Sequence, residues 1–138
     1  MIVLLEHMDY FTWMANGQGA VSIQDSESDR QGSEHNCLVA YVTVENTDKM
    51  ALDRAVKIIH SKALQFNVSS IVIYPFCHSP VKLAAPEKAA EIILSLQKKL
   101  CSALGDRITV KKAPFGTFKM REGRNKGHRE SVLLRVVR

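Results

Sequence analysis

The stretch from residue 37 to residue 74 constrains the fold most, because strand, helix and strand patterns follow one another there. Residues 37–45 are dominated by β-branched side chains, which favours a strand. Residues 48–66 carry an apolar stripe at helical spacing, formed by Leu52, Ala55, Val56, Ile59 and Ala63. A second strand, Ser70–Tyr74, ends where Pro75 removes a backbone donor. This order predicts two parallel strands joined by a helical crossover.

The remaining chain predicts one more helix and several strands. A helix is expected over 86–104, because Pro86 suits a first helical position and an apolar stripe runs up to Gly105. Strands are expected at 2–5, 107–112 and 131–137, with 117–120 as the return strand of a hairpin. The segment 16–36 holds few side chains that could enter a core, and we interpret it as a long polar loop.

Length and composition favour one cytoplasmic domain. With 138 residues, we expect an α/β fold in which a mixed sheet of about five or six strands is covered by two main helices. The three cysteines form no CxxC pair and the histidines show no ligand spacing, which argues against disulfides and metal ions and fits a reducing cytoplasm. The apolar runs are too short to span a membrane. The net charge of +5 is compatible with a polyanionic partner but does not establish one.

Three places combine polar side chains with the end of a predicted strand, at residues 7–10, 74–78 and 118–119, and residues 126–128 add charge. A strand that presents a titratable group at its carboxyl edge is a common way to build a site. Cys77 beside His78 could be an activated nucleophile, or a buried, inert thiol next to a histidine that caps the strand. The segment 119–129 is dense in cations, which favours contact with phosphate groups; they are Lys119, Arg121, Arg124, Lys126 and Arg129.

Several motifs occur together in a recognisable order. They are Leu4–Tyr10, Leu38–Glu45, Tyr74–His78, Lys112–Gly116 followed by Phe118–Lys119, and Lys126–His128. In this order and spacing, the chain resembles the N-terminal editing domain of archaeal-type threonyl-tRNA synthetase. The similarity spans nearly the whole chain, and the structurally related D-aminoacyl-tRNA deacylase is the nearest competing identity.

The resemblance implies a D-aminoacyl-tRNA deacylase-like fold over residues 1–138 and hydrolysis of L-seryl-tRNA formed in error on threonine tRNA. Serine is smaller than threonine, so a synthetic pocket cannot exclude it strongly by size and a second site must discard the error. The implied partners are the 3′ end of threonine tRNA carrying serine, the rest of a synthetase, and a second copy in a homodimer. The resemblance implies no cofactor, metal or membrane.

The resemblance also assigns roles to individual residues. Lys119 would contact the substrate as the residue most clearly needed for catalysis, with His78 at the same site. Residues at the amino-acid pocket, several of them contributing main-chain groups, would be Val44, Pro75, Phe76, Cys77 and Phe118. Contact with tRNA would come from the basic segment, through Arg121, Arg124, Lys126 and His128.

Two departures from the family pattern bear on activity. The family commonly has a tyrosine just before the lysine, where this chain has Phe118. It also has a glutamate four residues after the histidine of Lys-Gly-His, where this chain has Val132, so Glu130 could serve as the carboxylate. A tRNA-binding or dimerisation module without chemistry and a free-standing D-aminoacyl-tRNA deacylase therefore remain alternatives. A cis bond between Ala113 and Pro114 would favour the D-amino-acid alternative by analogy.

Overall fold

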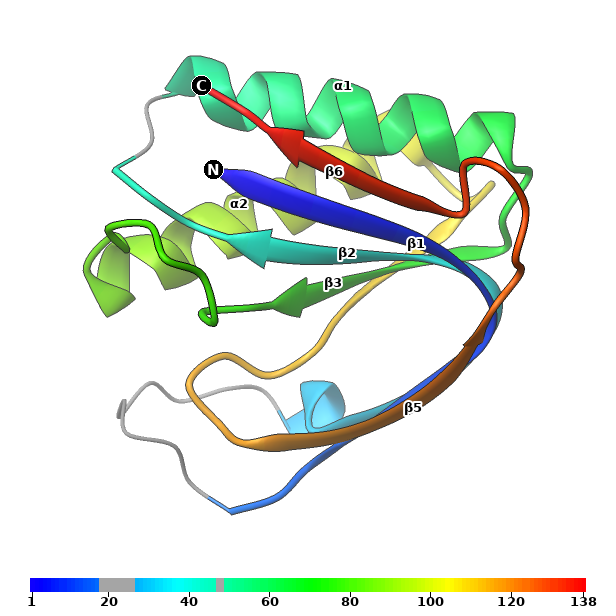
Figure 1. The fold of residues 1–138 in the computed structure, drawn as a ribbon, viewed down its shortest axis with the longest axis horizontal. Helices are drawn as coiled ribbons and strands as arrows, with labels where there is room; N and C mark the ends of the chain where they lie inside the picture. The colour runs from blue at the N-terminus through cyan, green and yellow to red at the C-terminus, as the bar shows by residue number, and fades with distance from the viewer. Residues whose placement is uncertain (18–26, 47–48) are drawn as a thin grey trace.

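The computed structural model describes residues 1–17, 27–46 and 49–138, which form one mixed sheet with two helices on one face (Figure 1). In chain order, the elements are β1 (Ile2–Ala15), the 3-10 helix η1 (Glu27–Asp29), β2 (Gln31–Thr43), α1 (Lys49–Gln65), β3 (Ser70–Pro75), α2 (Pro86–Leu104), β4 (Thr109–Lys112), β5 (Lys119–Asn125) and β6 (Val132–Val136). The strand order is β4-β3-β2-β1-β5, and β6 also pairs with β1. The predicted α/β architecture is confirmed.

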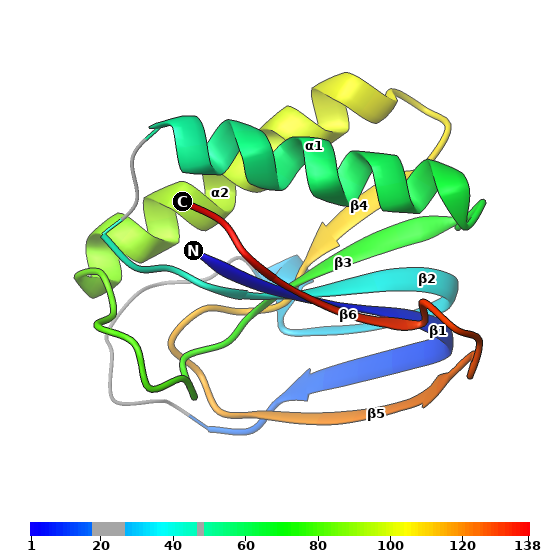
Figure 2. The same ribbon diagram turned by 45° about the horizontal axis from the view of Figure 1, so that its top comes forward.

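The parallel part of the sheet is formed by β2, β3 and β4. Ala40 on β2 pairs with Ile73 on β3, which in turn pairs with Lys112 on β4. The helices α1 and α2 lie together across one face (Figure 2) and occupy the predicted positions, although the predicted start of α1 at residue 48 lies outside the described residues. Asn67, with φ of 52°, turns the chain out of α1 into β3. The predicted helical crossover is therefore confirmed.

The two faces of the sheet bury different side chains. On the helix-covered face, Val3 and Leu5 of β1 pack with aliphatic residues of both helices and of β3. The other face carries an aromatic cluster, formed by Phe11, Trp13, Tyr41 and Tyr74 with Met8, Cys37, Val39, Val72 and Ala113. Because side chains alternate along a strand, each strand contributes to both clusters. The aromatic cluster is the one on which the candidate site is built.

The first two strands are longer than the sequence predicted. β1 extends to Ala15 instead of ending at Leu5, so His7–Tyr10 lie inside a strand and the prediction of a strand end there is wrong. β2 begins at Gln31, so the last part of the predicted loop 16–36 is a strand. Gln31, Ser33 and His35 are exposed, which shows why composition suggested a loop. Residues 18–26 of that loop lie outside the described residues.

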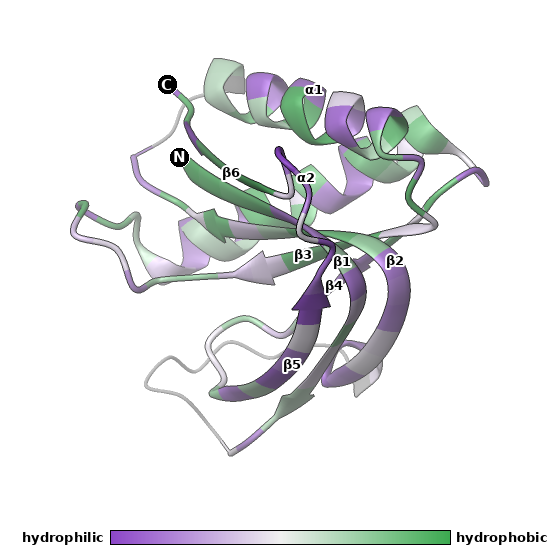
Figure 3. Cartoon of the chain, turned by 45° about the vertical axis from the view of Figure 1, so that its right-hand side comes forward, coloured by the Kyte–Doolittle hydropathy of each residue, from purple (hydrophilic) through white to green (hydrophobic). Residues whose placement is uncertain are grey.

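The predicted hairpin between 107–112 and 117–120 is wrong. β4 pairs in parallel with β3, whereas β5 pairs antiparallel with the distal half of β1, from Met8 to Ala15. β6 pairs with the proximal half of β1, from Ile2 to Glu6. The basic segment is thus largely a strand, and Figure 3 shows β5 as mostly hydrophilic. The long β1 strand leaves an edge that β5 and β6 share, and this pairing outweighs the short sequence separation from β4.

Among the described residues, no helix is long and apolar enough to cross a membrane.

Candidate active site at the carboxyl end of β3

Lys119 is held at the start of β5 by the loop that precedes it. Its Nζ donates hydrogen bonds to the carbonyl oxygens of Pro114, at 2.9 Å, and Thr117, at 3.1 Å. The same ammonium lies 5.0 Å from the centre of the Tyr74 ring, which is within cation–π range. Two carbonyl dipoles and an aromatic face therefore keep the Lys119 charge at the carboxyl end of β3.

Two tyrosine rings form the floor beneath Lys119. Tyr41 and Tyr74 are register partners on β2 and β3, and their ring centres are 5.3 Å apart. The Arg121 guanidinium carbon lies 5.8 Å from the centre of the Tyr41 ring and 5.7 Å from that of Tyr74. Burial raises the pKa of both phenols, so both remain neutral at physiological pH. The site thus presents two cations over two neutral phenol rings.

The chain beyond β3 continues the same surface. The Phe76 ring contacts Tyr41, with ring centres 5.9 Å apart, and His78, at 5.4 Å. Phe76 is fixed through its backbone, because its N–H donates to the Val42 carbonyl at 3.0 Å and its carbonyl accepts from the Thr43 hydroxyl at 2.7 Å. His78 is therefore linked to Lys119 through the rings of Phe76, Tyr41 and Tyr74.

The predicted pocket residues have distinct exposures at this edge. Val44 and Pro75 are buried, and the Val44 carbonyl accepts a hydrogen bond from the Ala84 N–H at 2.9 Å. Cys77 is exposed, so the predicted burial of its thiol is wrong. Phe118 is 65% exposed and its carbonyl accepts a hydrogen bond from the Asn16 N–H at 2.7 Å. Phe118 adjoins Lys119, Pro75 is the last residue of β3, and Cys77 lies two residues beyond it.

The predicted tRNA-binding residues do not share one face. Lys119 and Arg121 pair with Ala15 and Trp13 on β1 and face the aromatic cluster. Side chains alternate along β5, so Arg124 points to the face opposite Lys119 and Arg121. There it makes an ion pair with Asp9. The hydrogen bond from Arg124, followed by its charge, lowers the pKa of Asp9. Lys126 lies 3.6 Å from Asp9, and so belongs to this second group.

His128 and Glu130 lie near the end of α1, on the helix-covered face. The His128 Nε2 is 2.7 Å from the Nδ1 of His7, and both rings pack against Phe66. The Glu130 carboxylate makes an ion pair with Lys62 at 3.4 Å and accepts a hydrogen bond from the Gln65 amide at 3.0 Å. These two contacts lower the pKa of Glu130. Neither His128 nor Glu130 joins the Lys119 cluster.

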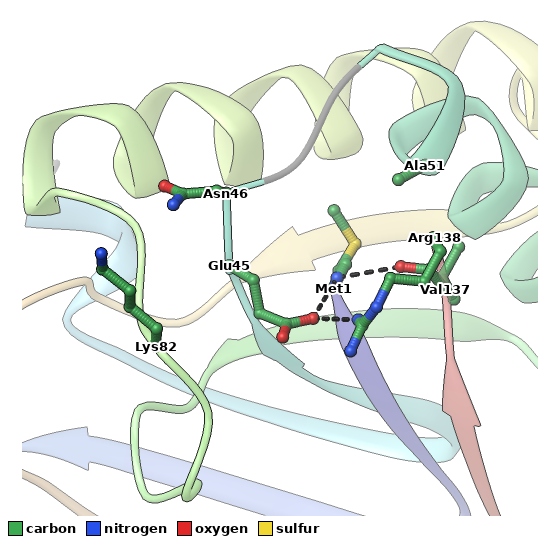
Figure 4. A pocket seen from close by; sticks show the side chains of 7 residues that line it. All are labelled: Met1, Glu45, Asn46, Ala51, Lys82, Val137 and Arg138. Carbon is green, nitrogen blue, oxygen red and sulfur yellow. Dashed lines mark hydrogen bonds and ion pairs between the residues drawn. The ribbon is translucent and has the colours of Figure 1, made fainter.

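A separate cavity of about 310 Å³ lies where the two ends of the chain meet (Figure 4). The Met1 ammonium donates hydrogen bonds to Glu45 Oε2 at 2.7 Å and to the Val137 carbonyl at 2.9 Å, and Arg138 also pairs with Glu45. The hydrogen bond from the Met1 ammonium is the main cause that lowers the pKa of Glu45. Within the described parts of the chain, no group of three His, Cys, Asp or Glu residues is arranged to hold a metal ion.

Comparison with protein families identifies the chain. A model of the Archaea-specific editing domain of threonyl-tRNA synthetase matches residues 1–137. The chain belongs to this family. The resemblance inferred from the motifs is thereby confirmed.

Curated relatives of this editing domain are threonine–tRNA ligases. The ligase of Methanosarcina mazei is 32% identical over the whole chain, and that of Hyperthermus butylicus is 33% identical over 98% of it. The chain spans only 22% of the length of each ligase.

Two solved structures share the fold of the editing domain. A c-Myc DNA unwinding element binding protein matches with a TM-score of 0.73 at 12% identity, covering all of this chain and 99% of the other. A probable eukaryotic D-amino acid tRNA deacylase matches with a TM-score of 0.58 at 11% identity, covering 97% of this chain and 96% of the other. At such low identity, these matches establish the deacylase-like fold alone.

Sequence reasoning did not point to two residues that the structure places at or near this candidate site. Tyr41 is central to the ring cluster, and it could have been found by pairing the two predicted parallel strands, which places it beside Tyr74. Glu6 lies on the same face, since Leu4 packs against the aromatic cluster and alternate residues share a face. Glu6 was assigned to a polar strand end because β1 was expected to stop at Leu5.

Proposed function

We propose that this editing domain hydrolyses the ester bond of L-seryl-tRNA formed in error on threonine tRNA, in the cytoplasm and as part of a threonyl-tRNA synthetase. The observation that carries the proposal is the Lys119 ammonium, held by the Pro114 and Thr117 carbonyls over the Tyr74 ring. Membership of the editing-domain family supplies the reaction class. The site lies where the carboxyl end of β3 meets the start of β5.

The chemistry requires a water molecule to attack the ester carbon and the ribose oxygen to leave with a proton. A fixed ammonium such as Lys119 stabilises the negative charge that develops on the carbonyl oxygen, or orients the water. The protein's contribution is then placement and electrostatics, with the ribose 2′-hydroxyl of the terminal adenosine positioned to assist. His78, at the same edge, is proposed to line the space around the ester.

Discrimination against threonine is proposed to be steric. Main-chain groups of Val44, Pro75 and Cys77 would surround the serine side chain, and the extra methyl of threonine would meet them. A site of this kind removes the smaller amino acid, which a synthetic pocket rejects poorly. Arg121, above the tyrosine rings, is proposed to contact the phosphate backbone near the 3′ end of the tRNA.

A second copy of the chain is the proposed partner for β6. Val132, Leu134 and Val136 are 55%, 59% and 59% exposed and project from the same face of β6. In the described chain β6 is an edge strand, and exposed apolar edges are normally covered. We therefore propose a homodimer in which these side chains are buried.

Two alternatives are favoured by particular observations. Phe118 lacks the hydroxyl that the family commonly places before the lysine, and Val132 lacks its carboxylate, which would suit a binding module without chemistry. The deacylase-like fold would suit removal of D-amino acids. However, the described chain contains no cis peptide bond, so the feature that would have favoured D-amino-acid chemistry is missing from Ala113–Pro114.

Replacing Lys119 tests the proposed role directly. We expect Lys119→Met to lower the rate of L-seryl-tRNA deacylation by about a hundredfold or more, because the charge that meets the transition state is lost. Lys98→Met removes an exposed lysine from α2 and should leave the rate unchanged. Undiminished hydrolysis by Lys119→Met in single-turnover assays would exclude Lys119 as the catalytic residue.

A further inference from the structure

We propose that Glu6 is a positioning residue of this site: its carboxylate holds the Tyr41 hydroxyl, and the Tyr41 ring in turn fixes the Arg121 guanidinium for contact with tRNA. The inference rests on the proposed hydrolysis of seryl-tRNA. It adds a carboxylate from β1 to a site otherwise built from β2, β3 and β5.

The register of the sheet puts Glu6 on the face of the site. Leu4 and Met8, two residues before and after it on β1, pack in the aromatic cluster, whereas Leu5 belongs to the helix-covered core. The cross-strand partner of Glu6 on β2 is Val39, which is also in the aromatic cluster. Glu6 therefore projects toward the tyrosine floor and away from the helices.

A hydrogen bond and the strand register place the Glu6 carboxylate beside Tyr41. The Asn125 amide donates to Glu6 Oε2 at 3.3 Å and also to the Ser131 carbonyl at 2.9 Å, which ties the carboxylate to the connection between β5 and β6. On β2, Tyr41 pairs with Leu4 and Val39 pairs with Glu6, so Tyr41 is the diagonal neighbour of Glu6 on the same face, within reach of a long side chain. A charged acceptor at this position would attract the Tyr41 hydroxyl more strongly than a neutral one and fix the direction of the Tyr41 ring.

The charge of Glu6 complements the cations of the site. Lys119 and Arg121 stand 5.0 and 5.7 Å from the centre of the same Tyr74 ring, so their like charges repel each other. Glu6 adds one negative charge next to Tyr41, its diagonal neighbour across the strands, and the Arg121 guanidinium lies 5.8 Å from the centre of the Tyr41 ring. Burial and the Glu6 charge together raise the pKa of Tyr41, which keeps this phenol a donor to Glu6 and not a competing anion.

The neighbour of Glu6 on β6 is Val132, at the position where a carboxylate was expected from the family pattern. The two residues are direct register partners, and Val132 is 55% exposed. Side chains of directly opposed residues leave the sheet about 5 Å apart, so they can reach the same space. In this chain, Glu6 supplies a carboxylate where β6 supplies none.

Kinetics of L-seryl-tRNA hydrolysis test the positioning role. Glu6→Gln keeps an acceptor for Tyr41 but removes the charge, and we expect it to raise KM about tenfold while kcat changes less than about threefold. The matched control is Glu122→Gln, which should behave as wild type. Glu122 lies on the opposite face of β5 and accepts a hydrogen bond from the Tyr10 hydroxyl. Wild-type KM for Glu6→Gln would overturn the inference.

A conservative variant separates this role from a structural one. Glu6→Asp keeps the negative charge beside Tyr41 and shortens the side chain by one methylene, whereas Glu6→Gln keeps the length and loses the charge. We expect Glu6→Asp to keep KM within about threefold of wild type, because the inference assigns the negative charge to this position. Equal losses in Glu6→Asp and Glu6→Gln, with both variants folded, would contradict the inference.

A binding experiment keeps this inference distinct from the proposed hydrolysis. The probe is a minihelix of threonine tRNA with an uncharged 3′ end, and affinity is measured for Glu6→Gln, Arg121→Ala and the double variant. We expect Glu6→Gln to weaken binding in the wild-type background and to have no further effect once Arg121 is absent. Additive effects would overturn the role of Glu6. If this coupling is present but no ester is cleaved, only the proposed hydrolysis fails.

Discussion

His7 joins three parts of the chain that are distant in the sequence. Its Nε2 bonds to the Asn36 side-chain oxygen at 3.1 Å, and its Nδ1 lies 2.7 Å from His128. The Asn36 amide nitrogen donates to the Asn67 carbonyl, so the Asn36 oxygen is the acceptor and His7 Nε2 carries the proton. His7 is then a neutral ring that accepts from His128. Burial, as the largest cause, lowers the pKa of His7 below 6.5.

This depressed pKa predicts a loss of stability in mild acid. As the pH falls through 6.5, the unfolded chain protonates His7 before the folded chain does, so the free energy of unfolding decreases until the folded pKa is passed. We expect urea unfolding at about pH 7.5 and about pH 5.5 to show this loss in wild type and a smaller loss in His7→Gln. His35→Gln, which removes an exposed histidine from β2, should keep the wild-type dependence. An identical pH dependence in His7→Gln would contradict the prediction.

At the residue scale, the sequence predicted which side chains belong to the candidate site better than it predicted which residues they contact. Motif spacing predicted that Lys119 and His78 serve one site, and the ring contacts of Tyr74 and Phe76 connect them. The contact between His7 and His128 spans 121 residues of chain, and no local pattern predicts it. Glu130 was chosen by its closeness in sequence to a missing carboxylate, whereas the sheet register brings Glu6 to that place.

At the scale of elements, periodicity predicted the buried elements well and the exposed strands poorly. Both helices and β3 have one-sided or continuous apolar patterns, so their positions follow from the sequence. β5 has mostly polar side chains, and only its pairing with β1 makes it a strand. That pairing depends on the length of β1, which the apolar run Ile2–Leu5 does not reveal.

β6 pairs with β1 but exposes an apolar face in the described chain, and this face predicts self-association. We expect Leu134→Asp to convert a dimer into a monomer, because a charge in a buried apolar interface is strongly unfavourable. Leu94→Asp, on an exposed position of α2 that is 43% accessible, should leave the dimer intact. Sedimentation velocity at several concentrations distinguishes the two states. A wild-type monomer, or a Leu134→Asp dimer, would contradict the proposed interface.

At the scale of the whole molecule, the aliphatic core and the candidate site lie on opposite faces of one sheet. The helix-covered face holds the aliphatic core, while the opposite face holds the tyrosine floor, Lys119 and Arg121. Substitutions in the site should therefore affect activity more than folding. Motif order was sufficient to predict the family and fold, but the division of the basic segment between two faces required the strand register.

The measurement that tests the central proposal most directly is a comparison of three esters. The protein is incubated with L-seryl-, L-threonyl- and D-aminoacyl-tRNA, and the rate of deacylation is measured for each. We expect cleavage of L-seryl-tRNA, with the threonyl ester slower by about a hundredfold or more because its extra methyl meets the pocket wall. Cleavage of D-aminoacyl esters alone, or binding of tRNA without cleavage of any ester, would contradict the proposed editing of serine.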